Sequence, residues 1–200
     1  MTSYNSPMTK LDAVNICLSA MGEPVINSLD AAATDAQMAA DIVDETSRSV
    51  QSNCWHWNNE QHTLSPTTDG YLMLPATTIR VEAVGSPYGI NVIQRGGKLF
   101  NKFNNSYVFT APLAVDLYLV LPFEDTPFSA KQFIAYRSAR ITQQRLLGSD
   151  TLYKMETADE LKAWAVLMQE EAATINANML TGSADTAAIL TRWAYARGGV

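Results

Sequence analysis

The amino-acid sequence changes character twice, and this alternation constrains the fold more than any other feature. Helical periodicity predicts helices over residues 8–21 and 35–53. Residues 54–125 are instead rich in Thr, Val, Tyr, Gly and Pro, with turn signals at short intervals, which is typical of β-strands. Two more helical patterns follow residue 125. This order predicts an α+β protein in which N- and C-terminal helices enclose an antiparallel β-rich segment.

The first helix has recognisable signals at both ends. Its apolar residues recur at helical spacing, at Leu11, Val14, Leu18 and Met21. Thr9 is the expected N-cap, because its hydroxyl can accept a hydrogen bond from a free backbone N–H of the first turn. Gly22 can take the left-handed conformation that ends a helix, and Pro24 cannot continue one.

The second helix is expected to begin with a capping box formed by Thr34 and Gln37. Its predicted apolar face consists of Met38, Ile42, Thr46 and Val50. This face is thin and the helix is rich in Ala, so we expect close packing against another helix. Asn53 is the expected stop.

The two C-terminal helices are predicted from their start signals. Thr126 is the expected N-cap of the third helix, Pro127 its first residue and Gly148 its end. Thr157 and Glu160 have the form of a capping box that would start the fourth helix. The apolar face predicted for the fourth helix consists of Leu161, Trp164, Leu167 and Met168.

These elements divide the chain into three parts. Residues 1–53 and 126–180 are expected to form a four-helix bundle, with the fourth helix reaching about residue 179. Residues 54–125 would form the inserted antiparallel β-rich domain, and residues 181–200 a tail with at most a short helix. The predicted strands are Tyr71–Leu74, Ile79–Val84, Asn91–Arg95, Lys98–Phe100 and Val115–Leu121. Gly96-Gly97 predicts a two-residue hairpin turn, and Asn104-Asn105 a second turn.

Composition limits the classes of function. Only 17% of the residues are charged, against about 25% in typical soluble proteins, which favours an oligomer or a large interface. The net charge of −6 argues against a protein that grips nucleic acid tightly, although DNA could slide past an acidic wall. Two cysteines exclude a cystine-rich scaffold. There is no secretory signal and no apolar stretch of membrane-spanning length, so we expect a soluble protein made in the cytoplasm, with no membrane partner.

A cluster of potential metal ligands lies at the junction between the second helix and the β-rich segment. Cys54, His56 and His62 are close in sequence, but a structural zinc site usually has four ligands and no fourth is near. The other interpretation is that this stretch closes the helix-to-strand junction, with Trp55 and Trp57 on one side. We therefore predict neither a metal nor a cofactor.

Catalytic signatures are weak. Carboxylates that could serve a glycosidase are Glu60, Asp69, Glu82, Asp116, Glu124 and Asp125. Nothing in their spacing singles out a pair, and the chain has neither a nucleophile elbow nor a phosphate-binding loop. The sequence therefore predicts that the protein is not an enzyme. The alternative hypothesis is a virion-associated carbohydrate hydrolase that uses Glu60, Glu82 and Asp116, and a third is a monomeric binding module.

The third predicted helix is basic in an otherwise acidic protein. Its cations are Lys131, Arg137, Arg140 and Arg145. Arg137 and Arg140 lie three residues apart and share a face. One interpretation is a solvated basic face. The other is that the arginines cross a subunit boundary to carboxylates such as Glu170 and Glu171, since a guanidinium pairs bidentately with a carboxylate.

Several stretches, taken in order, resemble the tail tubular protein A family of short-tailed bacteriophages. They are residues 11–25 with Val-Asn and Gly-Glu-Pro, 51–58, 95–100, 122–127, 136–140 and 170–180. In the second stretch Cys54 stands where the family usually has Gly, and Trp57 where it usually has Phe.

The resemblance implies a structural protein of the virion tail. It implies a ring of twelve subunits between the portal protein and a tail nozzle protein similar to tail tubular protein B, through which DNA leaves without specific binding. Trp193 and Tyr195 would anchor the tail on the portal, although a frayed terminus is equally compatible. The hairpin at Arg95, Gly96 and Gly97 would contact the nozzle or tail fibres.

Overall fold

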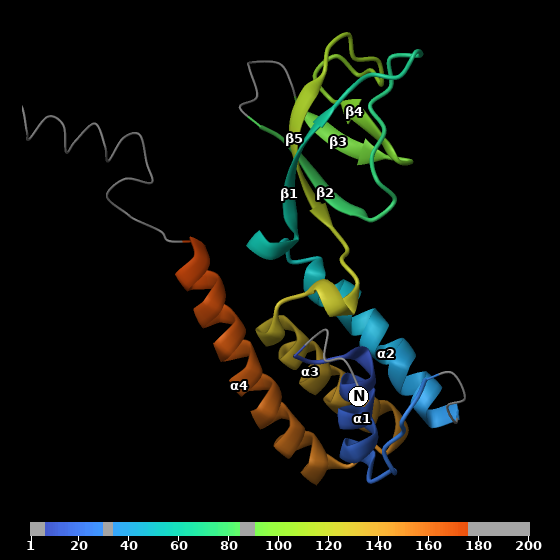
Figure 1. Ribbon diagram of the computed structural model, residues 1–200, viewed down its shortest axis with the longest axis vertical. Coiled ribbons are helices and arrows are strands. Elements are labelled where there is room, and N and C mark those ends of the chain that lie inside the picture. The colour runs from blue at the N-terminus through green and yellow to red at the C-terminus, as the bar shows by residue number, and fades with distance from the viewer. Residues whose placement is uncertain (1–6, 30–33, 85–90, 176–200) are drawn as a thin grey trace, which may run out of the picture.

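The computed structural model describes residues 7–29, 34–84 and 91–175 (Figure 1). Helices gather at one end of the molecule and strands at the other, so the prediction of an α+β protein with antiparallel sheets is confirmed. The helices are α1 (Lys10–Met21), α2 (Thr34–Gln51), α3 (Phe128–Leu146) and α4 (Asp150–Ile175). The strands are β1 (Asn59–Leu64), β2 (Thr78–Ala83), β3 (Val92–Arg95), β4 (Lys98–Asn101) and β5 (Leu113–Leu119). Two short 3-10 helices, η1 (His56–Asn58) and η2 (Phe123–Asp125), precede β1 and α3.

The ends of α1 confirm the sequence prediction. The Thr9 hydroxyl accepts a hydrogen bond from the Asp12 N–H at 3.2 Å, and the Asp12 carboxylate accepts one from the Thr9 N–H at 2.8 Å. At the other end Gly22 has φ +77° and donates its N–H to Ser19, while the next residue donates to Leu18. Local side-chain and backbone chemistry therefore fixes this helix at both ends.

Helix α2 differs from its prediction in two details. It begins at Thr34 itself, so the residue predicted as the N-cap is the first helical residue, and it ends at Gln51 rather than near Asn53. Met38, predicted on the buried face, is 39% exposed. The buried side is instead formed mainly by small residues: Ala36, Ala39, Ala40, Val43 and Ser47 pack there together with the predicted Ile42, Thr46 and Val50.

Helices α3 and α4 begin at other residues than predicted. Pro127 is the N-cap of α3, because the Thr126 hydroxyl donates to the Phe123 carbonyl and closes η2 instead. Helix α4 begins at Asp150, so the predicted capping box at Thr157 is wrong: the Thr157 hydroxyl donates to the Tyr153 carbonyl inside the helix. The predicted stop at Gly148 is confirmed by its φ of +66°.

Helices α1, α2 and α4 pack around α3, and we call the four helices together the helical body. Helix α3 lies between α4 on one side and α1 and α2 on the other (Figure 1). Its Ile134 and Ala135 are fully buried, as are Val14 of α1 and Val43 of α2. Burial also raises the pKa of the Cys17 thiol to about 12, so this cysteine is an apolar core residue rather than a reactive thiol.

The strands form two small sheets, and we call residues 59–84 and 91–119 the β region. One sheet has the order β1-β5-β2 and the other is the β3–β4 hairpin, both antiparallel. Along β5 buried residues alternate with more exposed ones, and the buried side meets Leu72, Val81, Val92 and Leu99 in a common core. The Gly96-Gly97 turn is confirmed by φ values of +57° and +73°.

Two parts of the β region differ from the prediction. Strand β1, Asn59–Leu64, was not predicted, because this polar strand lies at the edge of the sheet and is mostly exposed. The strand predicted at 71–74 is wrong, since Tyr71 and Met73 form only isolated bridges, to Val108 and Lys98. No helix of the described ranges combines the length and apolarity that a bilayer-spanning helix requires.

Candidate assembly surfaces

The helical body and the β region are joined by a hydrogen-bonded junction. Gln51, the last residue of α2, is fully buried. Its side-chain amide donates to the Leu121 carbonyl at 3.0 Å and accepts from the Leu121 N–H at 2.7 Å. Asn58, equally buried, donates to the carbonyls of Gln51 at 3.0 Å and Leu119 at 3.1 Å. The two amides therefore fix the chain entering and the chain leaving the β region to the same helix end.

An aromatic cluster packs beside this junction. Trp55 and Trp57 stack with ring centroids 6.4 Å apart and planes 9° apart, so both lie on one side, as predicted. The ring of Trp164 in α4 meets the ring of Trp55 edge-on, with centroids 5.8 Å apart. It is tilted against the ring of Phe133 in α3, with centroids 5.0 Å apart. The Trp55 indole N–H donates to the Val50 carbonyl at 2.7 Å. The cluster thus ties η1, α3 and α4 together.

The potential metal ligands have separate partners. The backbone N–H of His56 donates to one carboxylate oxygen of Glu171 at 3.0 Å, and its imidazole Nδ1 contacts the other. His62 contacts Glu60 at 2.8 Å on β1. Cys54 has φ +60° at the end of the α2 turn. Among the described residues, no group of three or more His, Cys, Asp or Glu is arranged to hold a metal ion.

The basic residues of α3 have partners within the chain. Arg140 forms an ion pair with Glu160 of α4, which Arg137 approaches at 3.8 Å, and Arg145 forms a bidentate pair with Glu45 of α2 at 2.8 and 3.1 Å. The Lys131 ammonium is buried and donates to the Glu124 carbonyl at 2.6 Å. Desolvation lowers the pKa of Lys131. The helix therefore does not present a continuous solvated basic face.

The candidate interface residues are not all equally accessible. The side chains of Arg137 and Arg145 are 38% and 51% exposed, whereas Arg140 is 17% exposed. Glu170 is exposed, but Glu171 is buried against His56. Contacts of these residues across a subunit boundary stay a prediction. Trp193 and Tyr195 lie outside the described residues.

The carboxylates of the hydrolase hypothesis divide between the two faces of one sheet. Glu82 and Asp116 lie directly opposite each other on β2 and β5. Glu60 pairs with Leu117, so it lies on the other face. Glu82 forms an ion pair with Arg80, whose guanidinium lies 5.9 Å from the ring centroid of Tyr118. Register thus brings two of the three carboxylates together and separates the third.

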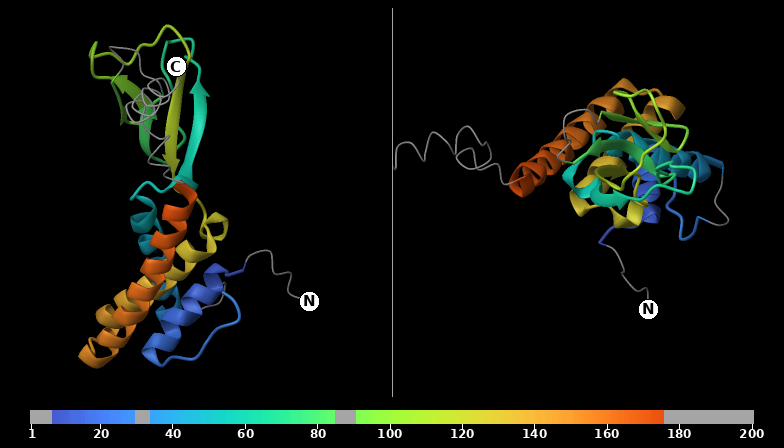
Figure 2. Two further views of the ribbon diagram at one scale, coloured as in Figure 1. Left: turned by 90° about the vertical axis from the view of Figure 1, so that its left-hand side faces the viewer. Right: turned by 90° about the horizontal axis from the view of Figure 1, so that it is seen from above.

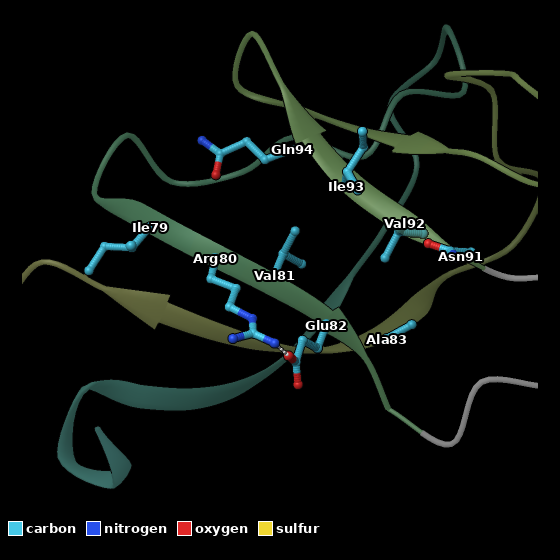
Figure 3. Close-up of a pocket in the computed structure, with 9 residues that line it drawn as sticks. All are labelled: Ile79, Arg80, Val81, Glu82, Ala83, Asn91, Val92, Ile93 and Gln94. Atoms are coloured by element: carbon cyan, nitrogen blue, oxygen red, sulfur yellow. Dashed lines mark ion pairs between the residues drawn. The ribbon is translucent and has the colours of Figure 1, made fainter. Parts of the chain in front are cut away.

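A groove of about 560 Å³ runs between β2 and β3 (Figure 3). It is lined by two strand edges, Ile79–Ala83 and Asn91–Gln94. The two strands belong to different sheets. Figure 3 shows the Arg80–Glu82 ion pair on one side of β2 and Val81 directed toward β3. The groove therefore offers strand edges and a neutralised ion pair as a contact surface.

The surface of the β region around the β3–β4 hairpin combines cations with exposed apolar side chains. Arg95 lies over the ring of Phe100 at 4.0 Å, and Lys98 over that of Tyr71 at 3.9 Å. Phe103 is 77% exposed and Val108 51%. The predicted hairpin contact at Arg95, Gly96 and Gly97 thus adjoins an apolar surface that is typical of partner-binding sites.

Comparison with known proteins identifies the family. The model of the family described as tail tubular protein matches residues 11–176, which cover the described helices and strands except the first residue of α1, and the junction between them. The chain belongs to the tail tubular protein family. It is 28% identical over 148 residues to tail tubular protein A of Klebsiella phage KP34, a match that covers 73% of this chain and 77% of that protein. This tail tubular protein is therefore a structural component of a phage tail and of the virion.

The sequence predictions missed the residues that hold this tail tubular protein together at the junction. Gln51 and Asn58 delimit one of the stretches that resemble the family, but the amides were given no structural role. Glu160 was assigned to a helix cap, whereas it pairs with Arg140. An amide residue at each end of the short α2-to-β1 connection was the available signal, because a buried amide needs hydrogen-bond partners, which Gln51 finds for both its donor and its acceptor and Asn58 for its donor.

Proposed function

We propose that this tail tubular protein forms the adaptor ring of twelve copies that joins the portal to the tail nozzle and surrounds the exit path of the DNA. The match to the family over residues 11–176 carries this proposal. The shape supports it, since the helical body and the β region lie at opposite ends of an elongated molecule (Figure 2). An adaptor needs two separate ends, each of which meets a different partner.

The proposed organisation follows the two regions. Residues 1–53 and 126–180 form a four-helix bundle that builds the ring wall, and residues 54–125 form an inserted β-rich domain. The hairpin with Arg95, Gly96 and Gly97 faces the nozzle or the tail fibres. The buried junction at Gln51 supports this role, because its hydrogen bonds tie the chain that leaves the β region to the end of α2.

The proposed contacts use the accessible residues. Arg137, Arg145 and Glu170 are exposed enough to meet a neighbouring subunit, and Arg140 and Glu171 hold α4 in place from within. Trp193 and Tyr195 are proposed to anchor the C-terminal tail on the portal. The net charge of −6 suits a DNA conduit, since an acidic wall repels the phosphate backbone and lets it slide.

We propose that the protein is not an enzyme. The carbohydrate hydrolase alternative requires two cooperating carboxylates, one of them a free acid or nucleophile. Glu82 and Asp116 are neighbours, but Arg80 neutralises Glu82 and Glu60 lies on the opposite face. Sugar release measured for wild type and for Glu82→Ala with Asp116→Ala separates the two hypotheses. Release by wild type that disappears in the double variant would establish the hydrolase.

The adaptor proposal is tested by mixing the purified chain with purified portal rings of its own phage and imaging the product by cryo-electron microscopy. We expect a second ring of twelve copies on the outer face of the portal. Deleting the residues after Leu180 should weaken portal binding and leave the fold intact. Portals that stay bare at high protein concentration would contradict the adaptor role.

A further inference from the structure

The β3–β4 hairpin is a positive surface on an acidic protein. Residues 83–115 contain Arg95, Lys98 and Lys102 and neither Asp nor Glu, in a chain whose net charge is −6. Arg95 and Lys102 are exposed, and Lys98 is half-buried. The acidic excess of the chain therefore lies entirely outside this segment, and the hairpin carries a charge opposite to that of the whole molecule.

These three cations have no carboxylate partner among the residues that the structure describes. Most other described cations do have one, as Lys10 has Asp44 and Arg145 has Glu45. An unpaired cation keeps its attraction for an incoming carboxylate, because no internal partner has to be displaced first. In this respect the hairpin differs from α3, whose arginines are already paired.

Aromatic rings hold two of the cations in place. The Arg95 guanidinium lies 4.0 Å from the ring centroid of Phe100, and the Lys98 ammonium lies 3.9 Å from that of Tyr71. Phe100 in turn meets Tyr107 edge-on, with ring centroids 4.8 Å apart. A ring orients a cation without neutralising it, so less side-chain freedom is lost when a partner binds.

Strand register places the two cations on the outer face of the hairpin. Arg95 pairs with Lys98 directly across the turn, so their side chains share one face. Leu99, the next residue, points to the other face and belongs to the core of the β region. The cations are therefore directed away from the core.

Exposed apolar side chains border the cations. Val108 is 51% exposed and forms a bridge to Tyr71, whose ring carries Lys98. Phe103 is 77% exposed and follows Lys102 just after β4. An exposed apolar patch of this kind is typical of a protein-binding surface. We call the following residues together the hairpin surface: Tyr71, Arg95, Lys98, Lys102, Phe103 and Val108.

Cations could attract either an acidic protein or a nucleic acid. Proteins that bind duplex DNA tightly make about 6–10 phosphate contacts. One copy of this chain offers three cations at the hairpin. A phosphate backbone also provides no apolar partner for Phe103 and Val108. The combination of few cations with exposed apolar side chains therefore favours a protein.

We propose that the hairpin surface binds an acidic face of the tail nozzle protein, in which carboxylates surround an apolar side chain. The carboxylates pair with Arg95, Lys98 and Lys102, and the apolar side chain packs against Phe103 and Val108. This inference rests on the proposed adaptor function, which directs the hairpin toward the nozzle, and it names the chemistry by which the nozzle is recognised.

The proposal is tested on adaptor rings assembled on portals, with purified nozzle protein of the same phage as the probe. Biolayer interferometry measures the dissociation constant at low and at physiological salt. Wild-type rings should bind more weakly as salt rises, because salt screens attraction between charges. Lys98→Glu with Lys102→Glu should weaken binding about tenfold at low salt and remove most of the salt dependence. Lys102→Glu alone, at an exposed residue, should give a smaller loss in the same direction.

Three further variants serve as comparisons. Lys98→Arg with Lys102→Arg keeps both charges and should bind like wild type. Arg48→Glu with Lys154→Glu makes the same change in net charge at exposed cations of the helical body and should also bind like wild type. Phe103→Ser should weaken binding by a similar factor at each salt concentration, because salt does not screen an apolar contact. An equal loss in the Arg48 and Lys154 variant would reduce the effect to net charge and overturn the proposal.

Other occupants of the hairpin surface give different outcomes. Failure of the Lys98→Glu, Lys102→Glu chain to form rings, with an unchanged melting temperature, would assign the surface to a neighbouring copy and overturn the proposal. A DNA duplex retained by wild-type rings and released by this variant would assign it to nucleic acid, with the same consequence. Nozzle binding that the variant leaves unchanged would overturn the inference while the adaptor role stands. Absence of wild-type rings on portals would overturn both.

Discussion

The helical body and the β region achieve their stability in different ways. The core of the body combines many alanines with large aromatic residues, so its helices approach closely and the gaps are filled by Trp55, Phe133 and Trp164. The core of the β region is aliphatic and follows the alternation of the strands, as Val115 and Leu117 show. Helix packing therefore decides which residues share the core of the body, and strand register decides which residues share the core of the β region.

The ion pairs show the same contrast. In the body most of them join different helices, as in Arg145 with Glu45 and Arg140 with Glu160, although Lys162 pairs with Asp159 within α4. In the described part of the β region the charged pairs join residues two apart on one strand, Arg80 with Glu82 and Glu60 with His62. Long-range polar contacts thus contribute to the tertiary structure of the body, whereas the β region depends on its backbone ladders and its apolar core.

The largest expected effects come from truncating one core at a time. Ile134→Ala in the body and Leu117→Ala in the β region should each lower the free energy of unfolding by about 2–5 kcal/mol, because both side chains are fully buried. Urea unfolding followed by far-UV circular dichroism reports mainly the helices, and tryptophan fluorescence reports the junction. If Leu117→Ala shifts the unfolding midpoints seen by both probes to the same lower urea concentration, the two regions unfold as one cooperative unit.

The junction should be next in magnitude. Gln51→Ala removes the two hydrogen bonds to Leu121 and leaves its part-buried backbone N–H and carbonyl without these partners, which costs about 2 kcal/mol. It should also separate the unfolding transitions of the two regions. Gln37→Ala, an exposed amide on the same helix, is the control and should change neither stability nor cooperativity. A single unchanged transition in Gln51→Ala would show that the aromatic cluster alone couples the regions.

Glycine substitutions should have a smaller effect that stays within one region. Gly97→Ala in the β3–β4 turn and Gly22→Ala at the end of α1 meet no neighbouring atom, so only the positive φ angles of +73° and +77° resist the added methyl group. Each should cost about 1 kcal/mol, measured by thermal unfolding. A loss of stability several times larger for Gly97→Ala than for Gly22→Ala would mean that the turn sets the register of the whole β region.

The smallest effects are expected for the arginines. Arg140→Ala should lower the melting temperature measurably, because it leaves the mostly buried Glu160 carboxylate with only the more distant Arg137. Arg145→Ala should leave the melting temperature unchanged, since both partners of its pair with Glu45 are about half exposed and solvent screens them. Equal melting temperatures for the two variants would remove the distinction between structural and surface arginines.

The success of the sequence predictions depends on how local each signal is. Thr9 with Asp12, Gly22, Gly148 and the Gly96-Gly97 turn were predictable because the groups that bond lie within a few residues of each other. Strand β1 was not, since an exposed polar edge strand has no apolar alternation and exists because β5 pairs with it. The start of α4 was misplaced because Thr157 has the form of a cap but bonds within the helix.

The candidate surfaces divide in the same way. The hairpin and the shared helix face of Arg137 and Arg140 could be predicted from the sequence, and the family resemblance rests on short motifs in order. The partners of Arg140 and Glu171 could not, because α3 with α4 and α4 with η1 meet through contacts distant in sequence. The exposure of Leu161 was also unpredictable, since periodicity shows that a helix has apolar residues but not which of two apolar sides faces the core.

The sequence by itself determined the α+β class, both ends of α1, the end of α3 at Gly148, the hairpin and the family, because each depends on residues that interact at short range or on motifs in order. Only the tertiary structure decided which side of α4 is buried, that Gln51 and Asn58 join the two regions, and that Glu82 meets Asp116 while Glu60 does not. These outcomes depend on pairing between distant segments. The physical reason is that burial and strand register are collective properties, fixed only when the whole chain has packed.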